Sequence, residues 1–298
     1  MNITITGGSG FIGRRLLKAL GADGHALHVL SRHAGTNMPA GVRISAWDPN
    51  RTAPPAEALR DADVVVSLAG EPVAQRWTVE SKRRIRESRV NGTRHLVEAM
   101  AALPRRPAAL ISASAIGYYG SRGDEILTEA SPAGTGFLPE VCVEWEKEAL
   151  AAQAIGMRVA LVRTGIVLDQ RGGALQRMLP PFRMGVGGKL GDGSQWMSWI
   201  HLDDLVGLFR HAILNPVQGP FNGVAPNPVA NTGFTRALAG ALHRPAVFPM
   251  PKFALSALFG EMSSVLLSSQ RVLPKAAETA GYSFRFPELN AALADVLK

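Results

Sequence analysis

Cysteine is nearly absent from the sequence, which holds a single one, Cys142, among 298 residues. One cysteine excludes a disulfide within the chain, and free thiols are typical of proteins from reducing compartments. The opening residues, MNITITGG, also lack the basic start and the apolar run of a secretory signal peptide. We therefore expect a cytoplasmic protein.

Long hydrophobic runs are missing as well. The most apolar late stretch, residues 253–273, is interrupted by Glu261, Gln270 and several serines. A membrane-spanning helix needs about 20 predominantly apolar residues, so this stretch favours packed helices. We expect no membrane partner.

Metal-ligand clusters and nucleic-acid-binding motifs are absent from the sequence, although its net charge is +8. No set of His, Cys and carboxylate residues has the spacing of a metal site, so we expect no metal. Much of the positive charge gathers at residues 82–89 (KRRIRESR), a run typical of a solvated helix face. We expect no nucleic-acid partner, whereas a phosphate-bearing small molecule would benefit from the positive field.

The first two-thirds of the chain alternate short β-branched runs with amphipathic stretches. This alternation is the pattern of βαβ units that share a parallel sheet. We predict an α/β fold, a Rossmann-type doubly wound parallel sheet with a small α+β C-terminal cap. The expected strands are 2–6, 26–31, 42–46, 64–68, 109–113 and 158–163, and the expected helices include 14–20, 79–102 and 139–152.

The character of the sequence changes after residue 169, where a glycine-rich run extends to residue 193. We predict a dinucleotide-binding domain over residues 1–172 and a substrate-side C-terminal region over 173–298, of which about 198–224 packs back on the sheet. The five glycines of residues 185–195 are compatible with a mobile flap or with an ordinary surface loop. His201 and Asp203 are expected to shape a helix start, with Asp203 as the N-cap.

A glycine-rich loop follows the first expected strand and opens the first helix. Gly7 permits the tight turn, Gly10 lets the backbone approach a pyrophosphate, and Gly13 lets the helix pack on the sheet. Free N–H groups at the helix start then hold the phosphates. The predicted cofactor loop comprises Gly7, Ser9, Gly10, Phe11, Ile12 and Gly13.

The second expected strand ends in Ser31-Arg32, about 20 residues beyond this loop. Enzymes that use NAD place an acidic residue there, on the ribose 2′-hydroxyl, but this sequence has none. Ser31 can donate a hydrogen bond, and the planar fork of Arg32 can bind a 2′-phosphate. The cofactor is therefore predicted to be NADP(H).

These features together resemble the extended short-chain dehydrogenase/reductases, in the NAD(P)-dependent epimerase/dehydratase branch. The resemblance covers nearly the whole chain, and it is most specific to an atypical subgroup known as epimerase family proteins, or cell-division-inhibitor-like proteins. It is carried by residues 68–72 (LAGEP), 114–120 (SAIGYYG), 145–146 (WE), 163–168 (RTGIVL), 199–204 (WIHLDD) and 269–274 (SQRVLP).

The resemblance implies further cofactor contacts. Leu68, Ala69 and Gly70 would line the adenine side of the cofactor, and Val167 would lie near the nicotinamide. Arg89 stands where related reductases carry an asparagine, so it either reaches the cofactor phosphates or the substrate, or is a surface residue of the basic helix.

The chemistry of these reductases uses a Tyr-x-x-x-Lys pair one helical turn apart, which this sequence lacks. Its three tyrosines have no lysine four residues later, and Val143 stands four residues before Lys147. We therefore expect Lys147 to be a solvated helix residue. Ser114 matches the active-site serine of the family.

Tyr118 or Tyr119 is the nearest candidate proton donor in place of the missing tyrosine, although both also suit packing beneath the glycine-rich loop. Glu144 or Glu146 would serve as an acid or base if buried, but a position on the helix surface is the more ordinary expectation for Glu146.

Two functions follow from these residues. The first is an NADP(H)-dependent oxidoreductase or epimerase that acts on a small, polar or anionic substrate under the C-terminal cap. The second is an NADPH-binding sensor or regulatory protein with little or no turnover, which the missing Tyr/Lys pair favours. The sequence leaves the substrate and the oligomeric state open.

Overall fold

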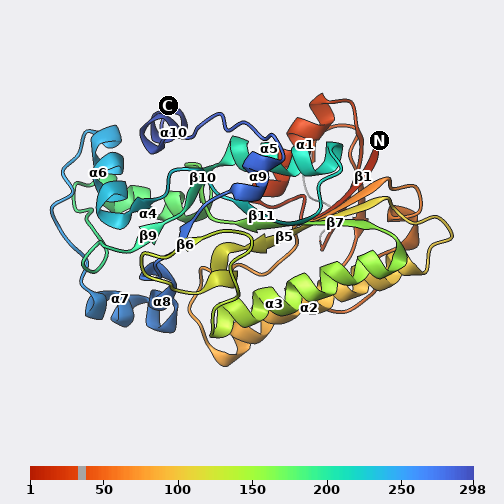
Figure 1. Ribbon diagram of the computed structural model, residues 1–298, viewed down its shortest axis with the longest axis horizontal. Coiled ribbons are helices and arrows are strands. Elements are labelled where there is room, and N and C mark those ends of the chain that lie inside the picture. Colours follow the sequence, from red (N-terminus) through yellow and green to blue (C-terminus); the bar gives the residue numbers. More distant parts are fainter. Residues whose placement is uncertain (33–37) are drawn as a thin grey trace.

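A seven-stranded sheet forms the centre of the computed structural model, which describes residues 1–32 and 38–298. Every pairing in this sheet is parallel, in the order β11-β7-β5-β4-β1-β2-β3 (Figure 1). The predicted Rossmann-type α/β fold is confirmed. The strands are β1 (Asn2–Thr6), β2 (Ala26–Ser31), β3 (Arg43–Ala46), β4 (Val64–Ser67), β5 (Ala109–Ala115), β7 (Arg158–Thr164) and β11 (Gly219–Gly223).

Helices cover both faces of the sheet (Figure 1). α1 (Phe11–Ala22) and α5 (Leu202–Leu214) lie on one face, and α2 (Val79–Ala101) and α3 (Phe137–Leu150) lie on the other. Strand side chains alternate between the two resulting cores, since Ile3 and Ile5 join the first and Val65 and Leu110 join the second. Burial on both faces explains the apolar runs of the central strands, such as VVV in β4 and VALV in β7.

A third core holds the C-terminal region together, with Trp199 and Phe234 fully buried in it. Residues 198–224 contribute elements to both parts, because β10 pairs with β8 whereas α5 and β11 join the main sheet unit. The domain boundary near residue 172 stays a prediction.

The remaining elements are β6 (Ile126–Leu127), β8 (Ile166–Leu168), α4 (Gly173–Arg183), β9 (Trp196–Met197), β10 (Trp199–His201), β12 (Val229–Ala230), α6 (Asn231–Leu242), α7 (Lys252–Phe259), α8 (Ser263–Leu266), β13 (Arg271–Val272), α9 (Lys275–Thr279), α10 (Leu289–Val296) and the 3₁₀ helices η1 (Ala56–Ala58), η2 (Ile116–Tyr119), η3 (Ala151–Ile155) and η4 (Gly260–Met262).

The start of α5 differs from the expectation. The N-cap is His201, whose Nδ1 accepts a hydrogen bond from the Asp203 backbone N–H at 3.0 Å. Asp203 is therefore wrong as the N-cap, and it lies in the first turn, where its carboxylate accepts from Arg15 of α1 at 2.8 Å. This ion pair links α5 to α1 on one face of the sheet.

Asp204 fixes the C-terminal segment to the same helix. Its buried carboxylate accepts hydrogen bonds from the backbone N–H groups of Arg285 and Phe286, both at 2.8 Å. Two backbone donors satisfy a buried charge that would otherwise be costly. The segment that leads into α10 is thereby held against the sheet unit.

The expected helices occupy most of residues 253–273, as α7, η4 and α8, but the stretch ends in the strand β13. None of the helices within residues 1–32 and 38–298 combines the length and the apolar character that crossing a bilayer requires. The packing is incomplete, however, because Phe253 and Leu258 of α7 are exposed.

Gly13→Ala should destabilise the fold, because the added Cβ would overlap the Gly7 carbonyl oxygen and lie 2.7 Å from the Gly8 Cα. Overpacking of this kind typically costs about 1–3 kcal/mol. Gly21→Ala in the same helix is the matched control, since the nearest atom to its Cβ is 3.9 Å away. Denaturant unfolding should show a loss for the first variant and a small gain for the second, in line with helix propensity. Equal stabilities would contradict the close packing of this loop.

Candidate cofactor and active site

The loop between β1 and α1 has the geometry of a phosphate-binding turn. Gly7 adopts a positive φ of 70°, and Gly10 is the N-cap of α1, with its amide donating to the Gly7 carbonyl at 3.0 Å. No acidic side chain occupies the first turn of α1, and no side chain caps it. The amide groups there are available to an anion.

The end of β4 lies against this loop. The backbone N–H groups of Leu68 and Ala69 donate to the Thr6 hydroxyl at 3.1 and 3.2 Å. A Cβ at Gly7 would lie 2.8 Å from the Ala69 nitrogen, so the two segments touch backbone to backbone. Gly70 follows directly, which brings the predicted residues of both segments into one site.

Phe11 and Val167 connect the loop to the C-terminal region. The Phe11 ring packs on the backbone at the start of α4, since a Cβ at Gly172 would lie 2.6 Å from its Cγ. Val167 lies in β8, buried, and its carbonyl oxygen would be 3.2 Å from a Cβ at Gly173. Ser9 and Ile12 are half-buried, and the Ser9 carbonyl accepts from Arg14 at 2.9 Å.

Ser31 and Arg32 lie beside the loop at the carboxyl end of β2. Thr6, the last residue of β1, is the register partner of Leu30, so Ser31 and Arg32 follow the same edge as Gly7. Ser31 is buried, and its carbonyl accepts from Trp47 at 2.9 Å. Arg32 is exposed and forms no ion pair with a described residue. No carboxylate stands at this strand end in the sequence.

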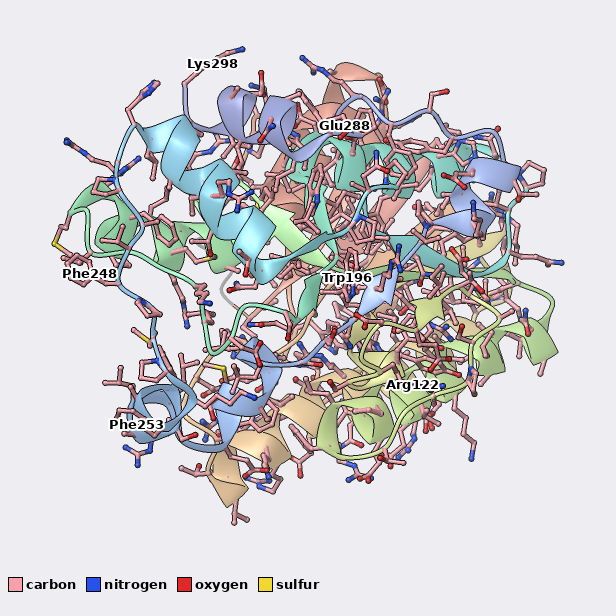
Figure 2. The ribbon with its side chains drawn as sticks, turned by 60° about the vertical axis from the view of Figure 1, so that its left-hand side comes forward. Arg122, Trp196, Phe248, Phe253, Glu288 and Lys298 are labelled. Atoms are coloured by element: carbon pink, nitrogen blue, oxygen red, sulfur yellow. The ribbon has the colours of Figure 1, made fainter. Side chains whose placement is uncertain are left out.

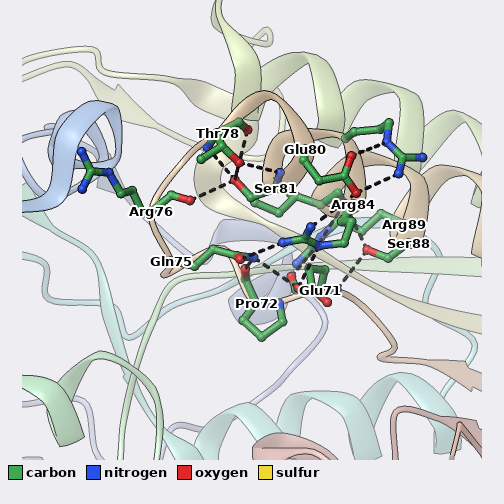
Figure 3. A network of polar contacts seen from close by, with 12 residues as sticks. Glu71, Pro72, Gln75, Arg76, Thr78, Glu80, Ser81, Arg84, Ser88 and Arg89 are labelled. Atoms are coloured by element: carbon green, nitrogen blue, oxygen red, sulfur yellow. Dashed lines mark hydrogen bonds and ion pairs between the residues drawn. The ribbon is translucent and has the colours of Figure 1, made fainter.

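Arg89 is not a surface residue of α2, so that alternative is wrong. Its guanidinium lies beneath Gly70 and donates to the carbonyls of Glu71 at 2.9 Å and Ile85 at 3.1 Å (Figure 3). Burial lowers the pKa of Arg89, against which the charge of Glu71 acts. This cation supports the segment after β4 from below, while Ser88 accepts a hydrogen bond from the Glu71 amide at 2.9 Å.

The rest of the basic run in α2 is largely paired with carboxylates. Arg83 bonds both Glu80 and Glu87, and Arg86 pairs with Glu144 of α3. Arg83 and Arg86 are exposed, whereas Arg89 is half-buried. Glu144 is thus engaged on the surface and is not the buried acid or base that the sequence left open.

A buried polar network lies where β5 and β7 end. Arg163 of β7 donates to both carboxylate oxygens of Glu146, from Nε to Oε1 and from Nη2 to Oε2, each at 2.8 Å. The Ser114 hydroxyl donates to Glu146 Oε1 at 2.6 Å. All three side chains are buried, so the expectation that Glu146 lies on the helix surface is wrong.

The charge balance of this network follows from that geometry. Burial alone would lower the pKa of Arg163, but its hydrogen bonds to the Glu146 carboxylate and the negative charge itself more than offset burial, so the pKa of Arg163 lies above its ordinary value. A serine hydroxyl can donate only one hydrogen bond, and Ser114 donates it to Glu146. In this arrangement Ser114 can accept a further hydrogen bond but cannot polarise a carbonyl.

The two tyrosines belong to the same network. Tyr119 is fully buried, donates to Asn222 Oδ1 at 2.6 Å and accepts from Arg163 at 3.0 Å. Burial raises the pKa of Tyr119 to about 12, with the charge of Arg163 opposing it. The half-buried ring of Tyr118 stacks on the guanidinium of Arg163, whose Cζ lies 3.5 Å from the ring centroid. Tyr119 is held as a structural residue, and Tyr118 is the more accessible of the two.

Lys147 is exposed on α3, which confirms the expectation that it is a solvated residue. Val143, four residues earlier, is 42% exposed and also points away from the network. The inner face of α3 instead presents Cys142 and Glu146. Burial raises the pKa of the Cys142 thiol to about 12, helped by the charge of Glu146.

The segment 185–195 is tied to its surroundings. The Leu190 amide donates to Asn231 Oδ1 at 2.8 Å, and the Gly191 amide donates to the Met250 carbonyl at 2.9 Å. Gly187 and Gly188 allow Phe182 and the Phe248 backbone to approach closely. The glycines thus have a packing role, and the flap stays a prediction.

Sequence reasoning missed Glu146, Arg163 and Asn222 as partners of Ser114 and Tyr119. One signal was present: Arg163 is a charge that directly follows the apolar run VALV of the strand RVALVRT. A buried charge requires a partner, and Glu146 is a carboxylate on the helix that packs on the same sheet face. Neither residue could be paired by sequence spacing alone.

A family model described as "NAD dependent epimerase/dehydratase family" matches residues 3–224. A second model, a domain of unknown function termed DUF1731, matches residues 250–296. The chain is 42% identical over 311 residues to the chloroplastic epimerase family protein SDR39U1 homolog of Arabidopsis thaliana, covering all of this chain and 87% of the relative. It is 38% identical to the epimerase family protein YfhF of Bacillus subtilis, over 100% of this chain and 98% of the relative.

Solved structures agree with these matches. Human epimerase family protein SDR39U1 (isoform 2), crystallised with NADPH, superimposes with a TM-score of 0.89 at 34% identity, over 99% of both chains. A structure termed a nucleoside-diphosphate sugar epimerase, from Corynebacterium glutamicum, superimposes with a TM-score of 0.80 at 39% identity, over 100% of this chain and 58% of that one. The resemblance found in the sequence is confirmed: the chain belongs to the NAD dependent epimerase/dehydratase family, among its epimerase family proteins.

Proposed function

We propose that the protein binds NADP(H) in the loop of residues 7–13 and acts as an oxidoreductase or epimerase on a small polar or anionic substrate. The observation that carries the proposal is the convergence of three backbone segments, after β1, β2 and β4, at one edge of the sheet. In doubly wound folds, nucleotides bind at this carboxyl edge. The NADPH in the structure of human SDR39U1 supports the same cofactor for this chain.

The preference for NADP(H) over NAD(H) rests on Arg32. It stands exposed at the end of β2, two residues past the register partner of Thr6. A 2′-phosphate on the adenosine ribose would meet its guanidinium, whereas a free 2′-hydroxyl would find no carboxylate there. Arg89 supports the cofactor site indirectly, through the segment after β4.

A second candidate function, an NADPH-binding sensor with little turnover, is favoured by the occupied hydrogen-bonding groups. The Ser114 hydroxyl donates its hydrogen bond to Glu146, and the Tyr119 hydroxyl donates its hydrogen bond to Asn222. Catalysis by Ser114 requires its hydroxyl to turn from Glu146 to the substrate. Sensing requires no such change, because binding the cofactor uses none of these groups.

Arg32→Ala should weaken the binding of NADPH about 10- to 100-fold and leave NADH nearly unchanged, because a charge-assisted hydrogen bond contributes about 1.5–3 kcal/mol. Fluorescence titration with each cofactor measures both affinities. Arg236→Ala, on the exposed face of α6, is the matched control and should bind like the wild type. If the wild type binds NADPH and NADH equally well, the assignment of Arg32 to the 2′-phosphate is wrong.

Ser114→Ala should slow any hydride transfer about 100-fold or more, since positioned acid–base groups contribute about 10²- to 10⁴-fold. Tyr118→Phe or Tyr119→Phe should cost less, and Lys147→Ala, on the exposed side of α3, should be close to neutral. Single-turnover oxidation of NADPH with a carbonyl substrate that the wild type accepts measures these rates.

A Lys147→Ala variant slower than Ser114→Ala would mean that the active-site helix is misplaced. If the protein binds NADPH tightly but turns over no member of a broad panel of carbonyl compounds, the sensor function is favoured over the enzyme function.

A further inference from the structure

Exposed apolar side chains gather on one part of the C-terminal region. Most large hydrophobic residues of the described chain are buried or scattered singly, but several stand close together in two segments, residues 184–186 and 247–258. Phe253 is 77% exposed and Phe248 58% exposed. We call the set the apolar patch: Met184, Val186, Val247, Phe248, Phe253 and Leu258.

The two segments of the apolar patch lie side by side. The Phe248 amide donates to the Gly187 carbonyl at 3.4 Å, and Leu190 forms a bridge with Met250. A Cβ at Gly185 would lie 3.6 Å from the Pro245 ring. Figure 2 shows Phe253 on α7 and Phe248 farther along the same outer margin, on the segment that leads to α7. The members of the patch therefore lie along one margin of the molecule.

α7 presents most of its apolar side chains to solvent. Among its eight residues, KFALSALF, only Leu255 is buried. A short helix that exposes phenylalanine and leucine gains nothing from them in the folded monomer, because burial of apolar surface is the main source of stability. Contiguous exposed apolar surface of this kind marks a contact with something outside the chain.

Positive charge predominates around the patch, because the two carboxylates that border it, Asp192 and Glu261, are each paired with a lysine, Lys252 and Lys82. Residues 173–191 and 240–260 contain no aspartate or glutamate, but they contain Arg177, Arg183, Lys189, Arg244 and Lys252. Arg183 and Arg244 are exposed and form no ion pair with a described residue. Lys252 is 3.8 Å from Asp192, an exposed carboxylate just outside these segments. A partner that fits this surface must be apolar and negatively charged.

We propose that the apolar patch and its cations form a docking surface for an anionic lipid bilayer. Phenylalanine and leucine side chains insert at the boundary between headgroups and acyl chains, while lysine and arginine meet the acidic headgroups. Contact of this kind needs no membrane-spanning helix, so the lack of long apolar runs does not oppose it. The proposal replaces the expectation, drawn from that lack, that the protein has no membrane partner.

The charge argues against a second copy of the chain as the occupant. Two copies packed patch to patch would bring five cations of one molecule against five of the other, with no carboxylate inside either surface to compensate them. An anionic bilayer supplies both the apolar interior and the negative charge. The proposal is independent of the activity in the cofactor site.

Vesicle co-sedimentation of the full-length protein tests the proposal. One set of vesicles is phosphatidylcholine alone, and in the other about a third of the lipid is phosphatidylglycerol. We expect binding to the second set only. Raising the salt from 0.1 to 1 M should weaken it strongly, because the Debye length falls from about 10 to about 3 Å.

The double variant Phe248→Ser with Phe253→Ser should lower vesicle binding by about tenfold or more, through the loss of inserted aromatic surface. Val143→Ser, which removes an exposed apolar side chain on α3, is the matched control and should bind like the wild type. Circular dichroism and NADPH titration establish that each variant is folded.

Several outcomes would overturn the proposal: no binding to the acidic vesicles, equal binding to both vesicle types, or equal binding of the double variant and the wild type. A dimer in solution that the double variant dissociates would assign the patch to a second copy instead.

Discussion

The ion pair between Arg163 and Glu146 is the constraint around which the active-site end of the sheet is arranged. It joins β7 to α3 with two hydrogen bonds of 2.8 Å in a buried setting. Removing one member of such a pair typically costs about 3–5 kcal/mol, because the other charge is left uncompensated. The remaining donors and acceptors must also be satisfied, and the hydroxyls of Ser114 and Tyr119 serve that purpose. The network therefore fixes the positions of the residues that family chemistry would use.

This arrangement separates cofactor binding from acid–base chemistry. The groups proposed to bind the dinucleotide are the loop of residues 7–13, the end of β4 and Arg32. None of them belongs to the buried network. The hydroxyls of Ser114 and Tyr119 donate to protein atoms and Lys147 is exposed, whereas Tyr118 is half-buried and contacts Arg163 through its ring. Proposed catalysis by Ser114 thus requires a bound substrate to replace Glu146 as the acceptor of the Ser114 hydrogen bond. The proposed enzyme requires this change of hydrogen-bond partner, and the proposed sensor does not.

The sequence predicted the parts of the fold that local patterns determine. The six expected strands and the glycine loop were located because β-branched runs and a turn–helix junction are readable over a few residues. β11 was not expected as a strand, since Gly219-Pro-Phe-Asn-Gly223 has poor strand propensity and is ordered by pairing with β7. The burial of Glu146 and the position of Arg89 depend on which helix face meets the sheet. His201 is the N-cap because its ring nitrogen accepts a hydrogen bond from the Asp203 amide. These are tertiary effects that spacing does not reveal.

A crystal structure of the protein with NADPH tests the central claim most directly. We predict the pyrophosphate at the backbone N–H groups of Phe11 and Ile12 in the first turn of α1, because the Gly10 amide already donates to the Gly7 carbonyl. The 2′-phosphate should lie within hydrogen-bonding distance of Arg32, and the nicotinamide ring should face Ser114. We also predict that the Ser114 hydroxyl remains within hydrogen-bonding distance of Glu146 until a substrate is present. A cofactor that lies away from the loop, or a 2′-phosphate that contacts neither Ser31 nor Arg32, would contradict the account.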